Sequence, residues 1–106
     1  MSERVVVLSC VGSAEDAARI ARALVERRLA ACVNVVAGVR SFYRWKGAVE
    51  EDEERLLVIK TRRDRFEPLR EALLALHPYE LPEAILLPIE AGHDPYLAWL
   101  DESVRP

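Results

Sequence analysis

The order in which strand-forming and helix-forming segments follow each other restricts this chain to very few folds. Short runs rich in valine, isoleucine and aromatic residues alternate with two segments whose apolar residues recur at helical spacing. We expect strands at Arg4–Val11, 31–45, 49–61 and 84–89, and helices at 13–28 and 64–76. The resulting order, βαββαβ, predicts an α+β domain of the ferredoxin-like type, in which two helices cover one face of an antiparallel four-stranded sheet.

Helix-capping residues indicate where the helices begin. Ser13 can accept a hydrogen bond from a backbone N–H in the first turn of the first helix. Asp64 can cap the second helix in the same way. An extra C-terminal helix is expected to follow, with Asp94 as its N-cap and Pro95 as its first residue. The apolar face of this last helix would consist of Tyr96, Trp99 and Leu100.

The length and charge of the chain limit its possible functions. Its 106 residues suit one domain, which we take as residues 1–106. The net charge of −3 opposes a dedicated nucleic-acid binder, which usually carries a large basic excess. No signal peptide is evident, and no apolar run approaches the roughly 18 residues of a membrane span. We therefore expect a cytoplasmic protein with no nucleic-acid or membrane partner, whose Cys10 and Cys32 are free thiols.

The expected strands carry apolar residues on both of their faces. Arg4–Val11 contains four valines in a nearly continuous apolar run, which is typical of a strand buried on both sides. Two helices can cover only one face of the sheet, so we expect a second copy of the chain to cover the other. Pro88 removes a backbone donor from the last strand, which indicates an edge strand or a bulge.

Five motifs, taken in their order along the chain, resemble the CutA family of divalent-cation tolerance proteins. They are RLAACVNVV (28–36), SFYRWKG (41–47), LVIKT (57–61), HPYELPE (77–83) and YLAWL (96–100). The resemblance covers roughly Val5 to Ser103. It implies a homotrimer of ferredoxin-like subunits, similar in architecture to PII signalling proteins, in which the long hairpin joins neighbouring subunits. It also implies a link to tolerance of copper and other divalent metals, without an established catalytic mechanism.

The segment HPYELPE (77–83) has two possible roles. Its two prolines would make it a stiff connector between the second helix and the last strand. A stiff connector does not require a histidine, a tyrosine and two glutamates, so the segment could also line a pocket between subunits through His77, Tyr79 and Glu80. His77 could then bind copper through its neutral imidazole, or transfer a proton near neutral pH.

The family resemblance further implies that a cysteine of the first strand is a metal ligand, together with histidines before the Pro-Tyr pair. Cys10 is the candidate, and thiolate is the ligand that copper(I) prefers. Aligned from Cys32 without a gap, however, Ser9 matches the position of that cysteine, and Leu76 stands where a second histidine could be. A shift of one residue reverses the face of a strand, so the alternative is that Cys10 is a buried core thiol.

Three further features belong to the expected cleft. Trp45 lies in an aromatic segment that would pack in a subunit interface. Lys60 is a single charge in an apolar strand, where its ammonium group would either reach solvent or pair with Glu80 or Glu54. The acidic run 50–54 is expected to be a solvated edge that discourages strand pairing. The residues expected in the cleft are Cys32, Trp45, Lys60, Tyr79 and Glu80.

No residue pattern indicates an enzyme, because neither a Ser-His-Asp nor a Cys-His arrangement can be assigned. Two hypotheses about function follow. The first is a trimeric cytoplasmic protein involved in tolerance to divalent metals, which binds copper or another divalent cation weakly at an intersubunit cleft through His77 and Cys10. The second is a PII-like signalling module whose cleft takes a small anionic molecule or a protein partner.

Overall fold

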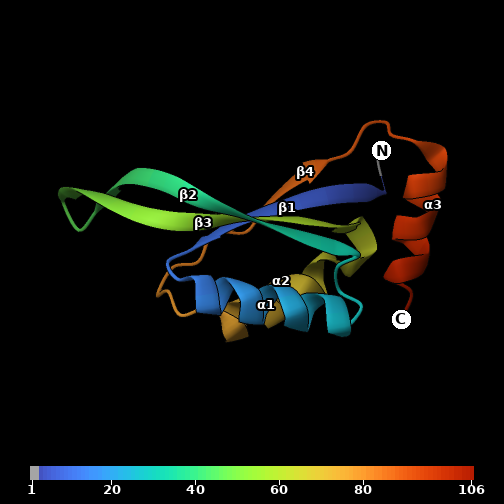
Figure 1. Cartoon of the computed structure of the whole chain (residues 1–106), viewed down its shortest axis with the longest axis horizontal. Helices are drawn as coiled ribbons and strands as arrows, with labels where there is room; N and C mark the ends of the chain where they lie inside the picture. Colours follow the sequence, from blue (N-terminus) through green and yellow to red (C-terminus); the bar gives the residue numbers. More distant parts are fainter. Residues whose placement is uncertain (1–2) are drawn as a thin grey trace.

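An antiparallel four-stranded sheet forms the centre of the structure, a computed structural model that describes residues 3–106 (Figure 1). The sheet order is β2-β3-β1-β4, which confirms the predicted ferredoxin-like plan and places Pro88 on an edge strand. None of the helices described in residues 3–106 is long and apolar enough to cross a membrane. The elements in chain order are β1 (Arg4–Val11), α1 (Ala14–Glu26), β2 (Cys32–Trp45), β3 (Ala48–Arg62), a 3-10 turn (Arg63–Arg65), α2 (Phe66–Leu76), β4 (Ile85–Pro88) and α3 (Asp94–Ser103).

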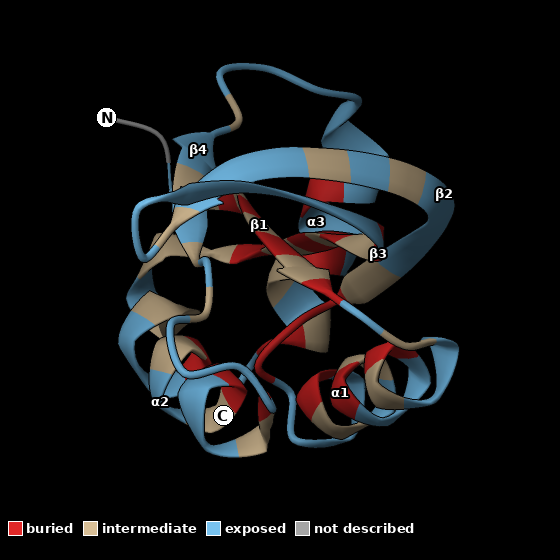
Figure 2. Cartoon of the chain, turned by 90° about the vertical axis from the view of Figure 1, so that its left-hand side faces the viewer, coloured by how far each residue is buried: buried red, intermediate tan, exposed pale blue. Residues whose placement is uncertain are grey.

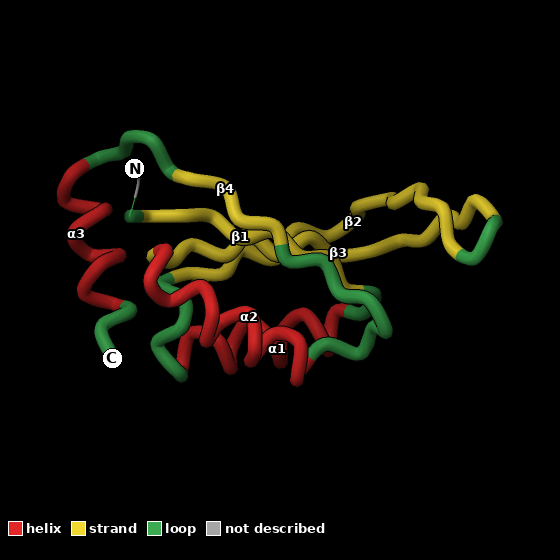
Figure 3. Tube along the Cα trace, turned by 180° about the vertical axis from the view of Figure 1, so that it is seen from behind, coloured by secondary structure: helices red, strands yellow, loops and turns green. Residues whose placement is uncertain are grey.

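The sheet has a core face, covered by α1 and α2, and an open face on the opposite side. Figures 1 and 3 show both helices on the same side of the sheet. Val5, Val7 and Val11 of β1 are fully buried on the core face, whereas Val6 and Leu8 on the open face are half-buried (Figure 2). A single chain therefore buries β1 on one face only, because neither α1 nor α2 covers the open face.

The hairpin formed by β2 and β3 projects beyond the rest of the chain (Figure 1). In its turn Lys46 and Gly47 have positive φ angles of 50° and 85°, as a two-residue type I′ turn requires. The pairing is irregular between Val36 and Val39, where Gly38 has a φ of 77°. The hairpin extends the molecule to 44 Å and raises its radius of gyration to 14.2 Å, against about 13 Å for an ordinary domain of this size.

Two of the three predicted helix caps are wrong. Ser13 does cap α1, since its Oγ accepts a hydrogen bond of 3.1 Å from a first-turn backbone N–H. Asp64 lies inside the 3-10 turn and does not cap α2, because its carboxylate accepts hydrogen bonds from Arg62 instead. His93 occupies the N-cap position of α3, so Asp94 is already the first helical residue, where its charge suits the positive end of the helix dipole.

The apolar face predicted for α3 is correct only at Leu100. Leu97 and Leu100 are the buried residues of this helix, and Leu100 packs with Ala31 beside the end of the sheet. Tyr96 and Trp99 are 40% and 48% exposed, with ring centroids 5.3 Å apart. The helix contacts the rest of the chain along a narrow stripe, so these two rings remain on its outer side.

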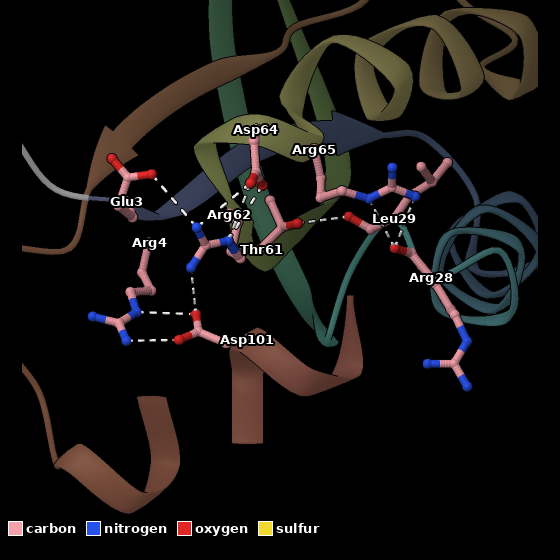
Figure 4. A network of polar contacts seen from close by, with 9 residues as sticks. All are labelled: Glu3, Arg4, Arg28, Leu29, Thr61, Arg62, Asp64, Arg65 and Asp101. Atoms are coloured by element: carbon pink, nitrogen blue, oxygen red, sulfur yellow. Dashed lines mark hydrogen bonds and ion pairs between the residues drawn. The ribbon is translucent and has the colours of Figure 1, made fainter. Parts of the chain in front are cut away.

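Ion pairs fasten α3 to β1 and β3 (Figure 4). Asp101 of α3 pairs with Arg4 at 2.7 Å and with Arg62 at 2.9 Å. Hydrogen bonds from these guanidinium groups, Arg4 first, hold the pKa of Asp101 below its usual value. Arg62 also reaches Asp64 and Glu3, so one guanidinium joins the start of the chain, the turn before α2 and the last helix.

Candidate functional site

A cleft of about 990 Å³ lies between the end of β1, the hairpin and the segment that follows α2. Its lining includes five carboxylates but only one guanidinium, that of Arg44, so the cleft is strongly acidic. Aromatic side chains form much of the remaining wall. The carboxylates are Asp52, Glu53, Glu54, Glu80 and Glu83, and the aromatic residues are Phe42, Tyr43, Trp45 and Tyr79.

Glu54 is the most buried of these carboxylates, with 7% of its surface exposed. Its Oε2 accepts a hydrogen bond of 2.6 Å from the phenol of Tyr79. None of the ion pairs described within residues 3–106 includes Glu54. Glu54 is therefore a buried carboxylate whose described partner is a neutral phenol, and a buried carboxylate is stabilised by a positive charge.

Gly12 leaves the space that Tyr79 needs for this hydrogen bond. A Cβ atom at position 12 would lie 3.0 Å from the phenol oxygen of Tyr79, closer than ordinary van der Waals contact. The absence of a side chain at Gly12 thus allows Tyr79 to reach Glu54 across the end of β1.

His77 ties the segment after α2 to β1. The ring is 7% exposed, its Nδ1 accepts the backbone N–H of Tyr79 at 3.1 Å, and its Nε2 lies 2.8 Å from the carbonyl oxygen of Cys10. Because Nδ1 is an acceptor, Nε2 carries the proton and donates it to that carbonyl. Both ring nitrogens are therefore engaged, and His77 could bind a metal only by releasing one of these hydrogen bonds. Its role as a ligand stays a prediction.

Cys10 and Ser9 lie on opposite faces of β1. Ser9 is fully buried on the core face with Val7 and Val11, and its hydroxyl has no hydrogen-bond partner within residues 3–106. Cys10 is half-buried and lines the cleft. Of the two neighbours, Cys10 is the one that lines the cleft, and its role as a metal ligand stays a prediction.

The other predicted cleft residues divide into two groups. Trp45, Tyr79 and Glu80 line the cleft. Cys32 and Lys60 do not: they face each other across β2 and β3, near the end of the sheet where β1 begins. In the part of the chain that the structure describes, Lys60 forms no ion pair with Glu80 or Glu54, and the Cys32 thiol lies 3.9 Å from the side-chain oxygen of Asn34.

Burial and neighbouring carboxylates raise the pKa of several groups in the cleft. Burial, followed by the charges of Glu83 and Glu54, raises the pKa of the Cys10 thiol to about 11. Burial and Glu54 likewise raise the pKa of Tyr79 well above its usual value. The pKa of Glu83 is also raised, first by burial and then by Glu54. Each group therefore holds its proton more tightly, first because of burial and then because of the neighbouring carboxylates.

The interpretation of the acidic run 50–54 as a solvated edge is wrong at Glu54. Residues 50–53 are exposed, but Glu54 is buried. The signal available in the sequence was strand alternation, which places Glu54 on the same face of β3 as Leu56 and Val58. The sequence analysis did not identify Glu83 and Tyr43 as cleft residues. Glu83 reaches the cleft from the loop after α2, and Tyr43 reaches it from the twisted hairpin.

The donors of one chain do not form a complete metal site. Among residues 3–106, no group of three or more His, Cys, Asp or Glu side chains is placed to hold a metal ion. The cleft nevertheless combines one thiol with several carboxylates, a donor set that attracts divalent cations. A divalent ion in this cleft would need ligands beyond those that the described residues bring together.

Comparison with known protein sequences places this chain among metal-tolerance proteins. A family model described as CutA1 divalent ion tolerance protein matches residues 5–103. The divalent-cation tolerance protein CutA of Thermus thermophilus is 55% identical over 98 residues, which cover 92% of this chain and 95% of that protein. The chloroplastic protein CutA of Arabidopsis thaliana is 48% identical over 101 residues, 95% of this chain but 56% of that protein. This chain therefore spans about half the length of its plant relative.

Solved structures agree with the sequence comparison. The divalent cation tolerance protein of Thermus thermophilus superposes with a TM-score of 0.94 at 53% identity, covering 96% of this chain and 99% of that one. A protein described as the periplasmic divalent cation tolerance protein CutA of Archaeoglobus fulgidus superposes with a TM-score of 0.93 at 37% identity, covering 96% and 99%. Since the family model covers nearly the whole chain and the fold agrees throughout, this chain belongs to the CutA1 divalent ion tolerance protein family.

Proposed function

We propose that this protein acts in tolerance to divalent metals, copper among them, as a cytoplasmic homotrimer that binds a metal ion weakly at a cleft between subunits. In this role it is a binding protein and not an enzyme. The observation that carries the proposal is Glu54, a buried carboxylate for which residues 3–106 show no ion pair and which lines the same cleft as the Cys10 thiol.

Weak binding follows from the available donors. Cys10 supplies one sulfur, while Glu54 and Glu83 supply oxygens, a mixture that suits borderline divalent ions. A metal must displace the proton of Cys10, whose pKa is about 11, so part of the binding energy is spent on deprotonation at neutral pH. His77 supports the site by holding Tyr79 against β1, and it becomes a ligand only where it releases one of its two hydrogen bonds.

The open face and the hairpin support a trimer. Val36, Ile85 and Leu87 lie on the open face and are 43%, 49% and 46% exposed, and large apolar side chains gathered on one face favour burial against another chain. A two-stranded hairpin is marginally stable in water on its own. A neighbouring copy that packs on the outer half of β2 and β3 would stabilise it and close the cleft.

The cytoplasmic location is supported by two free cysteines, which are typical of a reducing compartment. The alternative of a PII-like module with a small anionic ligand receives less support, because five carboxylates line the cleft and repel anions. A partner protein would have to present a basic segment to this cleft.

Calorimetric titration with copper(II) tests the proposal. Cys10→Ser and Glu54→Gln should each weaken binding about tenfold or more, because each removes a donor or a charge from the cleft. Cys32→Ser is the matched control and should bind as the wild type does, since Cys32 does not line the cleft. Equal affinity in all four proteins would contradict the proposal. Sedimentation equilibrium of the same samples should give three chains per particle, and a stable monomer would contradict the trimer.

A further inference from the structure

Glu54 is a buried carboxylate that forms no ion pair in the part of the chain that the structure describes. The carboxylate is 7% exposed, and its neighbour in the cleft is the neutral phenol of Tyr79. Arg55, the next residue, donates instead to the carbonyl of Gly12 and does not pair with Glu54 in the described part of the chain. A bound cation would balance this buried charge.

The cleft is elongated along the hairpin. Glu54 lies opposite Val39, while Trp45 lies opposite Ala48 near the tip, and both Glu54 and Trp45 line the cleft. The distance along β3 from Ala48 to Glu54 is about 20 Å, at about 3.4 Å per residue. Asp52 stands between them, on the same face as Glu54 and about 7 Å from it along the strand. The carboxylates are therefore distributed along a path and do not converge on one point.

Aromatic rings line the same cleft as these carboxylates. Tyr43, Trp45 and Tyr79 line the cleft, and the phenols of Tyr43 and Tyr79 are hydrogen-bonded to Asp52 and Glu54. Each carboxylate accepts a hydrogen bond from a tyrosine hydroxyl and therefore lies close to that tyrosine. Aromatic faces attract ammonium groups and also pack against methylene groups. A metal ion has neither an ammonium group nor a methylene chain to place against such rings.

We propose that the cleft binds a linear aliphatic polyamine, with one ammonium group at Glu54, another at Asp52 and the methylene chain against the aromatic rings. A compact ion matches the site less well, because a cleft of about 990 Å³ has room for about thirty water molecules at about 30 Å³ each. Donors that do not converge leave such an ion largely hydrated. This inference shares the cleft with the proposed function but does not depend on metal binding.

Calorimetric titration with spermidine tests the inference, and hexaamminecobalt(III) provides a compact cation of the same charge. The titrations are made at about 0.15 M salt, where nonspecific attraction to exposed charges is largely screened. Spermidine should bind more tightly than the cobalt complex. Glu54→Gln should weaken spermidine about tenfold or more, because a charge-assisted hydrogen bond is lost while the side-chain shape is kept.

Glu51→Gln is the matched control for Glu54→Gln. It removes the same charge from the same strand, but Glu51 does not line the cleft and pairs with Arg40. Spermidine affinity should be unchanged in this variant. Trp45→Leu should weaken spermidine and leave the cobalt complex unaffected. Equal affinities for the two cations, equal effects of the two glutamate variants, or no detectable binding of spermidine would each overturn the inference.

Cys10→Ser separates this inference from the proposed metal function. Sulfur is a preferred ligand of copper, whereas an ammonium group binds carboxylates better than a neutral thiol, so Cys10→Ser should weaken copper(II) binding far more than spermidine binding. Copper binding without spermidine binding would overturn the polyamine site and leave the metal site standing. Spermidine binding without copper binding would overturn the metal site and leave the polyamine site standing. Loss of the trimer in Glu54→Gln, with no spermidine binding to the wild type, would show that a neighbouring subunit supplies the cation and would overturn the inference.

Discussion

His77 donates a hydrogen bond from Nε2 to the carbonyl oxygen of Cys10, 2.8 Å away, and so joins the end of α2 to the end of β1. The same ring accepts the backbone N–H of Tyr79 through Nδ1. One buried imidazole thus fixes the position of both the residue that carries the thiol and the residue that carries the phenol of the cleft.

His77→Ala should lower the free energy of unfolding by about 2 to 4 kcal/mol, because it removes a buried ring and leaves two backbone groups without partners. His93→Ala is the control: His93 is exposed at the N-cap of α3 and its side chain makes no capping bond, so its effect should stay within about 0.5 kcal/mol. Chemical denaturation measures both. Similar small effects in the two variants would show that His77 does not anchor the segment.

Gly12→Ala should disturb the hydrogen bond between Tyr79 and Glu54, since the new Cβ would lie 3.0 Å from the phenol oxygen. We expect a loss of about 1 kcal/mol in stability. In a Tyr79→Phe background the phenol oxygen is gone, so the added methyl group should be tolerated. A double-mutant cycle measures this coupling. Additive effects of the two substitutions would contradict the close approach of Gly12 and Tyr79.

Alkylation of Cys10 should be slow at neutral pH and accelerate only toward its pKa of about 11. At pH 8 the thiolate fraction is about one thousandth, and the thiolate is the reactive form. The rate of reaction with iodoacetamide, followed by mass spectrometry in a Cys32→Ser variant, gives the pH profile. Glu83→Gln should shift that profile to lower pH, because the charge of Glu83 contributes to the raised pKa. An unshifted profile with an ordinary midpoint would show that the cleft is not negative at Cys10.

Asp101→Asn should destabilise the protein by about 1 kcal/mol at pH 7, a modest value because the ion pairs of Asp101 are partly exposed. The pKa of Asp101 is lowered in the folded state, so its contribution is present above the ordinary value of 3.8 and is lost as the pH falls through the lower, folded value. Stability measured between about pH 2 and 7 should therefore fall less steeply in the variant at the acid end. Glu102→Gln, which alters an exposed pair with Arg105, is the control. Parallel curves for wild type and Asp101→Asn would contradict the pairing.

The sequence predicts most of this fold because its signals are local. The nearly continuous apolar run of β1, the helical spacing in α1 and α2, and Gly47 in the hairpin turn each depend on neighbouring residues. The caps of α2 and α3 were not predicted correctly, since Arg62 competes for the Asp64 carboxylate and α3 begins one residue earlier than expected, at Asp94. Such competition between tertiary contacts is not visible in a local pattern.

The candidate site is only partly predictable for the same reason. Cys10, Tyr79 and Trp45 line the cleft as their motifs indicate, but Lys60 lies near the other end of the sheet. Its distance from the cleft depends on strand register, which a single sequence does not fix. Glu54 lies in a run of charges that is otherwise exposed, and alternation alone does not single it out, because Asp52 shares its face and is exposed. The contact with Tyr79 distinguishes it, and that contact depends on the tertiary fold.

Anomalous diffraction from crystals soaked with copper(II) tests whether the acidic cleft is the cation site of this protein. We expect a peak within the cleft, at coordination distance from Cys10 and a carboxylate of Glu54 or Glu83, and its loss in Glu54→Gln. Soaks of the Glu51→Gln variant should keep the peak. A peak only at His93 or on the outer surface, or a cleft without metal in wild-type crystals at saturating copper, would show that the cation site lies elsewhere.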